Sequence, residues 1–149
     1  MEKEPEELVE EKMTYEIISV RKKNTIRMKN PGVIYNAIKR YLNKNQEIFL
    51  VITMNVKLNI IAIHIATIGL MNRTIIHPRE VFRHAYIDNA YAVVVAHNHP
   101  SGELIPSDED IEITERLVEA GKILGINVID HLIISQNGFN SLRENGYMQ

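Results

Sequence analysis

Nearly continuous apolar runs alternate along the chain with segments in which apolar residues recur every three or four positions. The first pattern predicts strands buried on both faces, and the second predicts helices with one buried face. Strands are predicted at residues 15–20, 47–54, 58–68, 91–96 and 126–135, and helices at residues 31–42, 78–87 and 108–124, with a final helical turn at 141–145. This alternation predicts an α/β domain, with a mixed β-sheet flanked by helices.

Proline, glycine and short polar segments mark the ends of these elements. Pro31 and Pro78 each stand at the first position of a predicted helix, and His77 precedes the second of them as a helix cap. The connection at residues 55–57 is so short that the strands on either side of it are predicted to form a hairpin. Gly125 is predicted to end the last long helix.

The buried face of the last long helix is predicted from its apolar stripe. Ile113, Leu117, Ala120 and Leu124 recur at helical spacing. Ser107 precedes this helix as a predicted N-cap, and the acidic residues that follow it complement the helix dipole.

The composition fits one globular domain after a short acidic tail. The chain has 149 residues, of which 45% are hydrophobic and 24% charged, and both fractions are ordinary for such a protein. Residues 1–12 are predicted to be a flexible acidic tail, and residues 13–149 the domain. No apolar run is long enough to span a bilayer and the acidic start is not a signal peptide, so a cytoplasmic location is expected.

The chain has no cysteine, which excludes disulfides, thiolate metal ligands and cysteine nucleophiles. Any metal ion must therefore be held by histidine, aspartate or glutamate. The net charge of −2 gives no general electrostatic reason to bind nucleic acid. Nothing in the sequence specifies an oligomeric state.

The candidate chemistry follows the apolar run at residues 93–96. His97 and His99 are separated by one residue, so in an extended segment both imidazoles point to the same side. Asp110, in the first turn of the next helix, can return over the loop at residues 100–106, which Pro100, Gly102 and Pro106 shape. Two neutral imidazoles and one carboxylate suit a catalytic zinc ion with one open position, where bound water has a pKa of about 7.

Each of these residues also has a plainer interpretation. Asp110 could simply complement the helix dipole, as Asp108 and Glu109 do. A single histidine here would be an ordinary surface residue. Two histidines at this spacing, between a buried strand and a capped acidic helix, favour a metal site.

The remaining histidines are assigned weaker roles. His64 lies inside an apolar strand and is predicted to be a satisfied core or sheet-face residue, whereas His84 is predicted to be a solvated helix position. The pair Asp130-His131 either orients a metal ligand from behind or pairs within the last strand, and the sequence does not choose between these alternatives.

The histidine segment resembles the JAMM motif of the JAB/MPN metalloproteases, and more closely the RadC family. The resemblance extends from about Asn30 to Gly146. Longer RadC proteins carry an N-terminal helix-hairpin-helix region, which this chain is expected to lack together with any DNA contact it supports. The resemblance rests on His97-Asn98-His99-Pro100-Ser101-Gly102, Pro106-Ser107, Asp110-Ile111, Asp130-His131 and His77-Pro78-Arg79-Glu80-Val81-Phe82.

The resemblance implies an architecture like that of the cytidine deaminases, a mixed sheet flanked by helices. It does not imply deaminase chemistry, because that zinc signature requires P-C-x-x-C and the chain has no cysteine. It implies instead a zinc ion held by His97, His99 and Asp110, and a peptide or protein substrate cut at a peptide or isopeptide bond.

The resemblance also implies a general base and an oxyanion-stabilising residue. Glu47, which opens a buried strand and precedes Ile48-Phe49, is the expected base, with Glu80 and Glu103 as rivals. Ser107 matches the motif serine, whose hydroxyl stabilises the oxyanion. The same oxygen could instead cap the helix, and the sequence leaves both roles open.

Two non-catalytic alternatives remain at this stage. One is a binding module associated with DNA repair or mobile elements, with a vestigial metal site. The other is a metal site that serves stability alone. The small net charge does not favour autonomous DNA binding.

Overall fold

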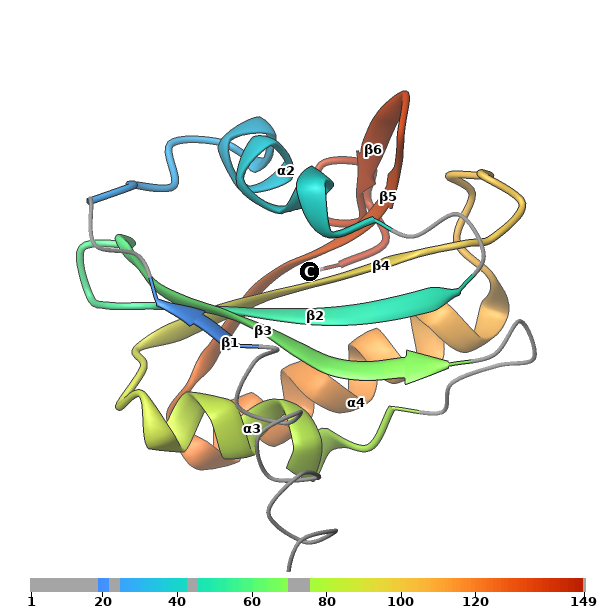
Figure 1. The fold of residues 1–149 in the computed structure, drawn as a ribbon. Helices are drawn as coiled ribbons and strands as arrows, with labels where there is room; N and C mark the ends of the chain where they lie inside the picture. Colours follow the sequence, from blue (N-terminus) through green and yellow to red (C-terminus); the bar gives the residue numbers. More distant parts are fainter. Residues whose placement is uncertain (1–18, 22–24, 43–45, 70–75, 149) are drawn as a thin grey trace, which may run out of the picture.

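The computed structural model describes residues 19–21, 25–42, 46–69 and 76–148. Within these residues, six strands form one sheet in the order β1-β3-β2-β4-β5-β6 (Figure 1). The strands are β1 (Ser19–Arg21), β2 (Glu47–Met54), β3 (Ile60–Gly69), β4 (Ala92–Asn98), β5 (Asn127–Ser135) and β6 (Gly138–Ser141). The helices are α2 (Pro31–Ile38), the short 3-10 helix η1 (Lys39–Tyr41), α3 (Pro78–Ile87) and α4 (Asp108–Leu124).

The pairing of the strands makes the sheet mixed, as the sequence predicts. β4 and β5 are parallel, and every other neighbouring pair is antiparallel. Parallel neighbours need a crossover connection, and α4 supplies it between β4 and β5. The predicted hairpin of β2 and β3 is confirmed.

Each face of the sheet carries its own core, because successive residues of a strand point to opposite faces. In Figure 1, α2 lies on one face, and α3 and α4 lie on the other. The α2 face buries even-numbered residues of the central strands, such as Leu50 and Val94. The face of α3 and α4 buries odd-numbered ones, such as Val51 and Val95. His97, in the same alternation, therefore points to the α4 side.

The end of the chain differs from prediction. The predicted helical turn at 141–145 is wrong at its start, because Ser141 is the last residue of β6, which pairs with β5. Hydrogen-bonded turns follow β6, not a regular helix. Four residues with mixed polarity were too short a run to show a strand period. Only the pairing with β5 satisfies their backbone groups.

Two boundaries also differ. The helix predicted at 31–42 ends at Ile38, and its last turn is the 3-10 helix η1. The strand predicted at 15–20 is observed as β1, whose first residue is Ser19, and residues 15–18 lie outside the described residues. The predicted tail at 1–12, and thus the domain boundary at residue 13, also lie outside them.

The buried face of α4 is rotated from the predicted stripe. Leu117 is fully buried, but Leu124 is 39% exposed, and Thr114 and Gly121 are buried in its place. A Cβ on Gly121 would lie 2.4 Å from the carbonyl oxygen of Ile126. The end of α4 therefore packs against the chain entering β5 only because residue 121 has no side chain.

The predicted solvated position of His84 is wrong. Its side chain lies under the sheet and stacks on His64 of β3, with ring centroids 4.3 Å apart. His64 Nε2 lies 2.6 Å from Asp88 Oδ2, and the Thr53 hydroxyl donates to the same oxygen at 2.7 Å. We call His64, His84, Asp88 and Thr53 the His64 cluster. His64 is thus the satisfied core residue that the sequence predicts.

His77 caps α3 as predicted, since its side chain accepts a hydrogen bond from the Arg79 backbone N–H. None of the helices in the described part of the chain is both long and apolar enough to cross a membrane.

Candidate metal centre

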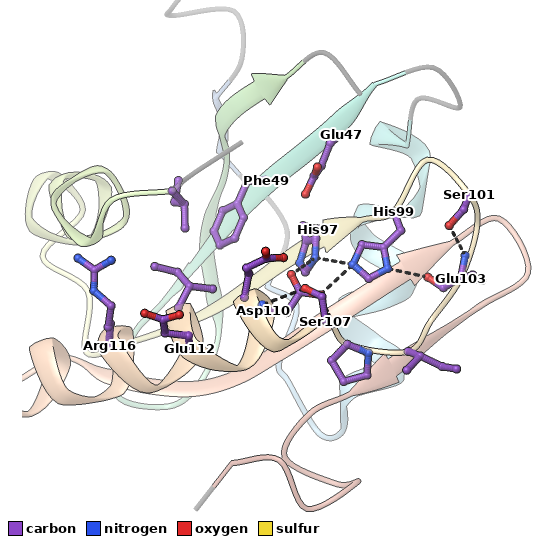
Figure 2. Close-up of a pocket in the computed structure, with 15 residues that line it drawn as sticks. Glu47, Phe49, His97, His99, Ser101, Glu103, Ser107, Asp110, Glu112 and Arg116 are labelled. Atoms are coloured by element: carbon purple, nitrogen blue, oxygen red, sulfur yellow. Dashed lines mark hydrogen bonds and ion pairs between the residues drawn. The ribbon is translucent and has the colours of Figure 1, made fainter. Parts of the chain in front are cut away.

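Three predicted ligands converge where β4 ends and α4 begins (Figure 2). His97 Nε2 and His99 Nε2 are 3.1 Å apart. Each faces a different oxygen of Asp110, at 3.0 Å from His97 to Oδ1 and 2.9 Å from His99 to Oδ2. Within the described residues, this is the group of histidine and acidic side chains whose ligand atoms lie close enough together to hold a metal ion.

Local sequence explains why Asp110 reaches the histidines. Ser107 caps α4: its side chain accepts from the Asp110 backbone N–H at 3.1 Å, and Asp110 Oδ2 accepts from the Ser107 backbone N–H at 2.8 Å. This reciprocal capping box holds the Asp110 carboxylate at the helix start. The dipole interpretation and the ligand interpretation of Asp110 are therefore compatible.

The donor set fits zinc. In a tetrahedral site, bonds of about 2.0–2.1 Å separate neighbouring ligand atoms by about 3.3 Å. The 3.1 Å between the two imidazole nitrogens is close to that value, and each nitrogen also lies 3.0 or 2.9 Å from one of the two Asp110 oxygens. Two imidazole nitrogens and one carboxylate oxygen would leave the fourth position of a tetrahedral ion free for water or substrate.

The electrostatics of the cluster favour positive charge between the three side chains. The hydrogen bond with Asp110 raises the pKa of His99, against the effect of burial, and the Glu47 carboxylate adds to the rise. Burial alone would raise the pKa of Asp110, but hydrogen bonds with His97 and His99 outweigh it and lower that pKa well below its ordinary range. A site that stabilises a carboxylate and a cationic ring in contact suits a divalent cation.

His99 is oriented from its other ring nitrogen. His99 Nδ1 lies 3.1 Å from the Glu103 carbonyl oxygen, which only accepts hydrogen bonds, so Nδ1 carries the proton and Nε2 faces Asp110. The Phe49 ring lies nearly parallel to the His97 ring, with centroids 6.0 Å apart. Phe49 thus supports His97 from the neighbouring strand.

Glu47 lines the same cavity as the three ligands. The cavity has a volume of about 610 Å³, and Figure 2 shows the Glu47 carboxylate pointing toward His97 and His99. Phe49 pairs with His97, so two residues earlier Glu47 stands on the same face of β2, as the period of a strand requires. Among the rivals, Glu103 also lines the cavity, and Glu80 in α3 does not. The role of Glu47 as a base stays a prediction.

Asn98, between the two histidines, holds the backbone on both sides of Glu47. Its Oδ1 accepts from the Ile48 N–H at 2.7 Å, and its Nδ2 donates to the Gln46 carbonyl at 3.0 Å. Asn98 is buried and points to the opposite face of the sheet from His97. Asn98 belongs to the family motif, but its structural role could not be predicted locally, because its partners lie about fifty residues away.

Ser107 also lines the cavity. Its oxygen accepts a hydrogen bond in the helix cap, but a hydroxyl also has one proton to donate. Capping and oxyanion stabilisation are therefore compatible uses of this side chain, and its catalytic role stays a prediction.

His131 and Asp130 have different roles. The His131 ring is fully buried, and its Nε2 lies 2.7 Å from Nδ1 of the candidate ligand His97. Of the two alternatives for Asp130-His131, His131 therefore follows the first, in which it orients a metal ligand. Burial lowers the pKa of His131 well below its ordinary value, and His97 lowers it further. Asp130 turns away and accepts from the Ser141 hydroxyl and the His131 backbone N–H. Burial raises the pKa of Asp130.

Thr114 completes the surroundings of His131 and was not anticipated. Its hydroxyl oxygen lies 2.6 Å from His131 Nδ1 and donates to the Asp110 carbonyl oxygen at 2.6 Å. The sequence does contain a signal for this contact. In a helix, a threonine four residues after a candidate ligand places its hydroxyl beside the ligand's own backbone carbonyl.

The fold and the converging ligands define an α/β domain with a candidate mononuclear metal centre at the end of a central strand. The chain belongs to the RadC-like JAB domain family, whose model matches residues 28–147. The resemblance noted from the motifs is therefore confirmed.

Relatives agree with this assignment. A UPF0758 protein of Caldanaerobacter subterraneus is 54% identical over 108 residues, which cover 72% of this chain and 46% of the relative. UPF0758 proteins of Alkaliphilus metalliredigens and Thermotoga maritima are 48% and 47% identical, over 84% and 76% of this chain and 54% and 51% of their own lengths. The chain spans about half the length of these relatives, and their names state no activity.

Proposed function

We propose that the chain is a zinc-dependent hydrolase that cuts a peptide or isopeptide bond. The observation that carries the proposal is the convergence of His97, His99 and Asp110 on one point in a cavity that Glu47 also lines. When bound, zinc would supply a Lewis acid and a water of lowered pKa. The chain's own residues would hold the ion, move protons and orient the substrate.

In this mechanism Glu47 is the general base. Its carboxylate takes a proton from the attacking water and passes it to the leaving nitrogen, so one group acts first as a base and then as an acid. Asn98 holds the peptide groups on both sides of Glu47, which keeps the carboxylate at a constant place relative to the ligands on β4.

Ser107 supplies the oxyanion donor. Because its oxygen already accepts from the Asp110 N–H, its proton is directed elsewhere and is available to the carbonyl oxygen of a substrate. Such donors act where negative charge develops, and removing one typically costs about 100- to 1,000-fold in turnover.

The cavity supports a peptide as the substrate. Its walls combine apolar side chains, among them Phe49, Ile76 and Ile113, with the polar groups of the centre. A volume of about 610 Å³ accommodates several residues of an extended peptide, given that ligand sites generally measure about 300–1,000 Å³.

The test is to load the protein with zinc and assay it against a fluorogenic peptide library and a panel of lysine isopeptides. Glu47→Gln should keep the zinc but lower turnover by about 100- to 10,000-fold. Glu80→Gln, outside the cavity, is the matched control and should keep wild-type turnover. Hydrolysis unaffected by Glu47→Gln would transfer the base to another residue, and no hydrolysis by the zinc-loaded wild type would overturn the proposed function.

A further inference from the structure

A buried histidine that is not a ligand stands directly behind the candidate metal centre. His131 is 0% exposed, and its two ring nitrogens contact His97 on β4 and Thr114 on α4. The mechanism proposed above does not use either His131 or Thr114. Burying polar side chains costs folding free energy unless they are hydrogen-bonded, so a role for this pair at the metal centre is expected.

An irregularity in β5 turns His131 toward the metal centre. Val93 pairs with Val128, but the next residue of β4, Val94, pairs with Asp130, so Ile129 is an extra residue in β5. An extra residue reverses which side chains point to each face. Without it, His131 would point to the α2 side, away from His97. The bulge therefore places this imidazole behind the ligand.

The directions of the hydrogen bonds among Asp110, Thr114 and His131 follow from the Asp110 carbonyl oxygen, where the series ends. The Asp110 carbonyl oxygen can only accept, so the Thr114 hydroxyl donates its one proton to it at 2.6 Å. The Thr114 oxygen must then accept from His131 Nδ1, which lies 2.6 Å away. His131 therefore carries its proton on Nδ1.

The hydrogen bond between His131 and the candidate ligand His97 can be assigned in the same way. A metal ion bound at His97 Nε2 would use the lone pair of that nitrogen, which leaves the proton of the ring on Nδ1, and the proton of His131 already stands on its Nδ1. His131 Nε2 is consequently an acceptor, and His97 Nδ1, 2.7 Å away, carries the proton it accepts. In that arrangement His97 Nε2, which faces His99 and Asp110, is the nitrogen available to a metal ion.

We infer that His131 and Thr114 are positioning residues that hold His97 in the one tautomer able to bind a metal ion through Nε2. The inference rests on the proposed metal site but not on the peptide reaction. The chain of hydrogen bonds starts at one ligand, His97, and ends on the backbone of another, Asp110. It therefore also sets the separation between β4 and the first turns of α4, which carry these two ligands.

The two histidine ligands are oriented in different ways. His99 is held by the backbone carbonyl of Glu103, which no substitution removes. The tautomer of His97 depends on two side chains from two other elements. Substitutions of His131 or Thr114 should therefore alter the orientation of His97 and leave that of His99 unchanged.

The first experiment uses the wild-type protein with ¹⁵N-labelled histidine. Long-range ¹H–¹⁵N spectra of the zinc-free and zinc-loaded forms should show His131 protonated on Nδ1, and His97 protonated on Nδ1 in both forms. An unprotonated His97 Nδ1 in either form, or zinc bound through Nδ1, would overturn the inference. This result does not depend on any enzymatic activity or on the folding of a variant.

The second experiment compares Thr114→Val with Thr114→Ser. Valine has nearly the same shape but no hydroxyl, whereas serine keeps it. Zinc affinity, measured by competition with a chromophoric chelator, should fall about 10- to 100-fold in Thr114→Val and stay within about threefold of wild type in Thr114→Ser. Equal affinities in both variants would contradict the inference.

His131→Gln and His131→Leu provide the matching pair at the other position. The glutamine amide can accept from His97 and donate to Thr114, so it should restore most of the zinc affinity that leucine loses. The absorption of Co²⁺ bound to each variant reports whether the ligand geometry is retained. If the wild type bound no zinc, the proposed function would fall, whereas the histidine spectra would still decide the tautomer.

Discussion

Two clusters with nearly the same residue types lie on the same face of the sheet. The His64 cluster contains two histidines, an aspartate and a threonine. The metal centre with its support contains three histidines, an aspartate and a threonine, and we call it the His97 cluster: His97, His99, His131, Asp110 and Thr114. Both join the sheet to a helix, α3 in the first and α4 in the second. Composition therefore does not separate them.

Their geometry does. In the His64 cluster, His64 Nε2 and the Thr53 hydroxyl share one oxygen of Asp88, and the His84 ring stacks flat on His64. In the His97 cluster, two imidazole nitrogens and a carboxylate face one another as a triangle on a cavity wall. Polar atoms that bond to each other in pairs stabilise the fold, whereas polar atoms aimed at a common point are suited to hold an ion.

The largest expected difference between the clusters is in zinc binding. The wild type should bind about one zinc ion per chain, and His97→Ala should bind less than about 0.1, because three ligands are the minimum of a catalytic site. Inductively coupled plasma analysis after dialysis measures the ratio. His84→Ala, in the His64 cluster, is the matched control and should still bind one. Equal zinc content in the two variants would show that the His97 and His64 clusters do not differ in metal binding.

The second prediction concerns stability, where the order of the clusters should reverse. Asp88→Ala leaves His64 and Thr53 buried without their shared acceptor, so the free energy of unfolding should fall by about 4 kcal/mol. Urea unfolding of chelator-treated protein measures it. Asp110→Asn keeps an oxygen that can accept from the Ser107 N–H and should cost less than Asp88→Ala under the same conditions. A larger loss in Asp110→Asn than in Asp88→Ala would show that the His97 cluster is the structural one.

The smallest predicted effect is a pH dependence in the His64 cluster. Burial, followed by the neighbouring His64, lowers the pKa of His84 from 6.5 to about 4. Between these values the folded protein binds fewer protons than the unfolded chain, so stability falls as the pH falls. The loss should reach at most about 3 kcal/mol at pH 4. Urea unfolding at a series of pH values measures the slope.

His84→Phe isolates this effect, because a phenyl ring can still stack on His64 but does not titrate. The variant should lose part of the acid sensitivity between pH 6.5 and 4 and keep its zinc content. An unchanged slope in His84→Phe would assign the acid sensitivity to other groups.

Much of the fold could be predicted because its signals are local. The apolar run of β2 and the capped start of α4 are each legible within about ten residues. The two histidines and Asp110 were found for the same reason, since a strand period and one short loop bring them together. Glu47 was proposed from the resemblance, and the strand register then placed it in the same cavity.

The errors and omissions share a different cause. His84 is polar and stands in an amphipathic helix, so only its contact with His64 reveals that it is buried. β6 is four residues long and exists through its pairing with β5. The side-chain partners of Asn98 and of the His131 ring are 17 or more residues away in sequence, and no local pattern reports such contacts.

By itself, the sequence determined the kinds of elements, the three candidate ligands and the family motif, because period, capping and spacing act over a few residues. Only the tertiary structure decided which histidines converge on the candidate metal centre and which stack or form hydrogen bonds with their neighbours instead. It also decided that a bulge in β5 turns His131 to the back of His97. The physical reason is that a metal centre is defined by the directions of lone pairs, and strands and helices distant in sequence set those directions together.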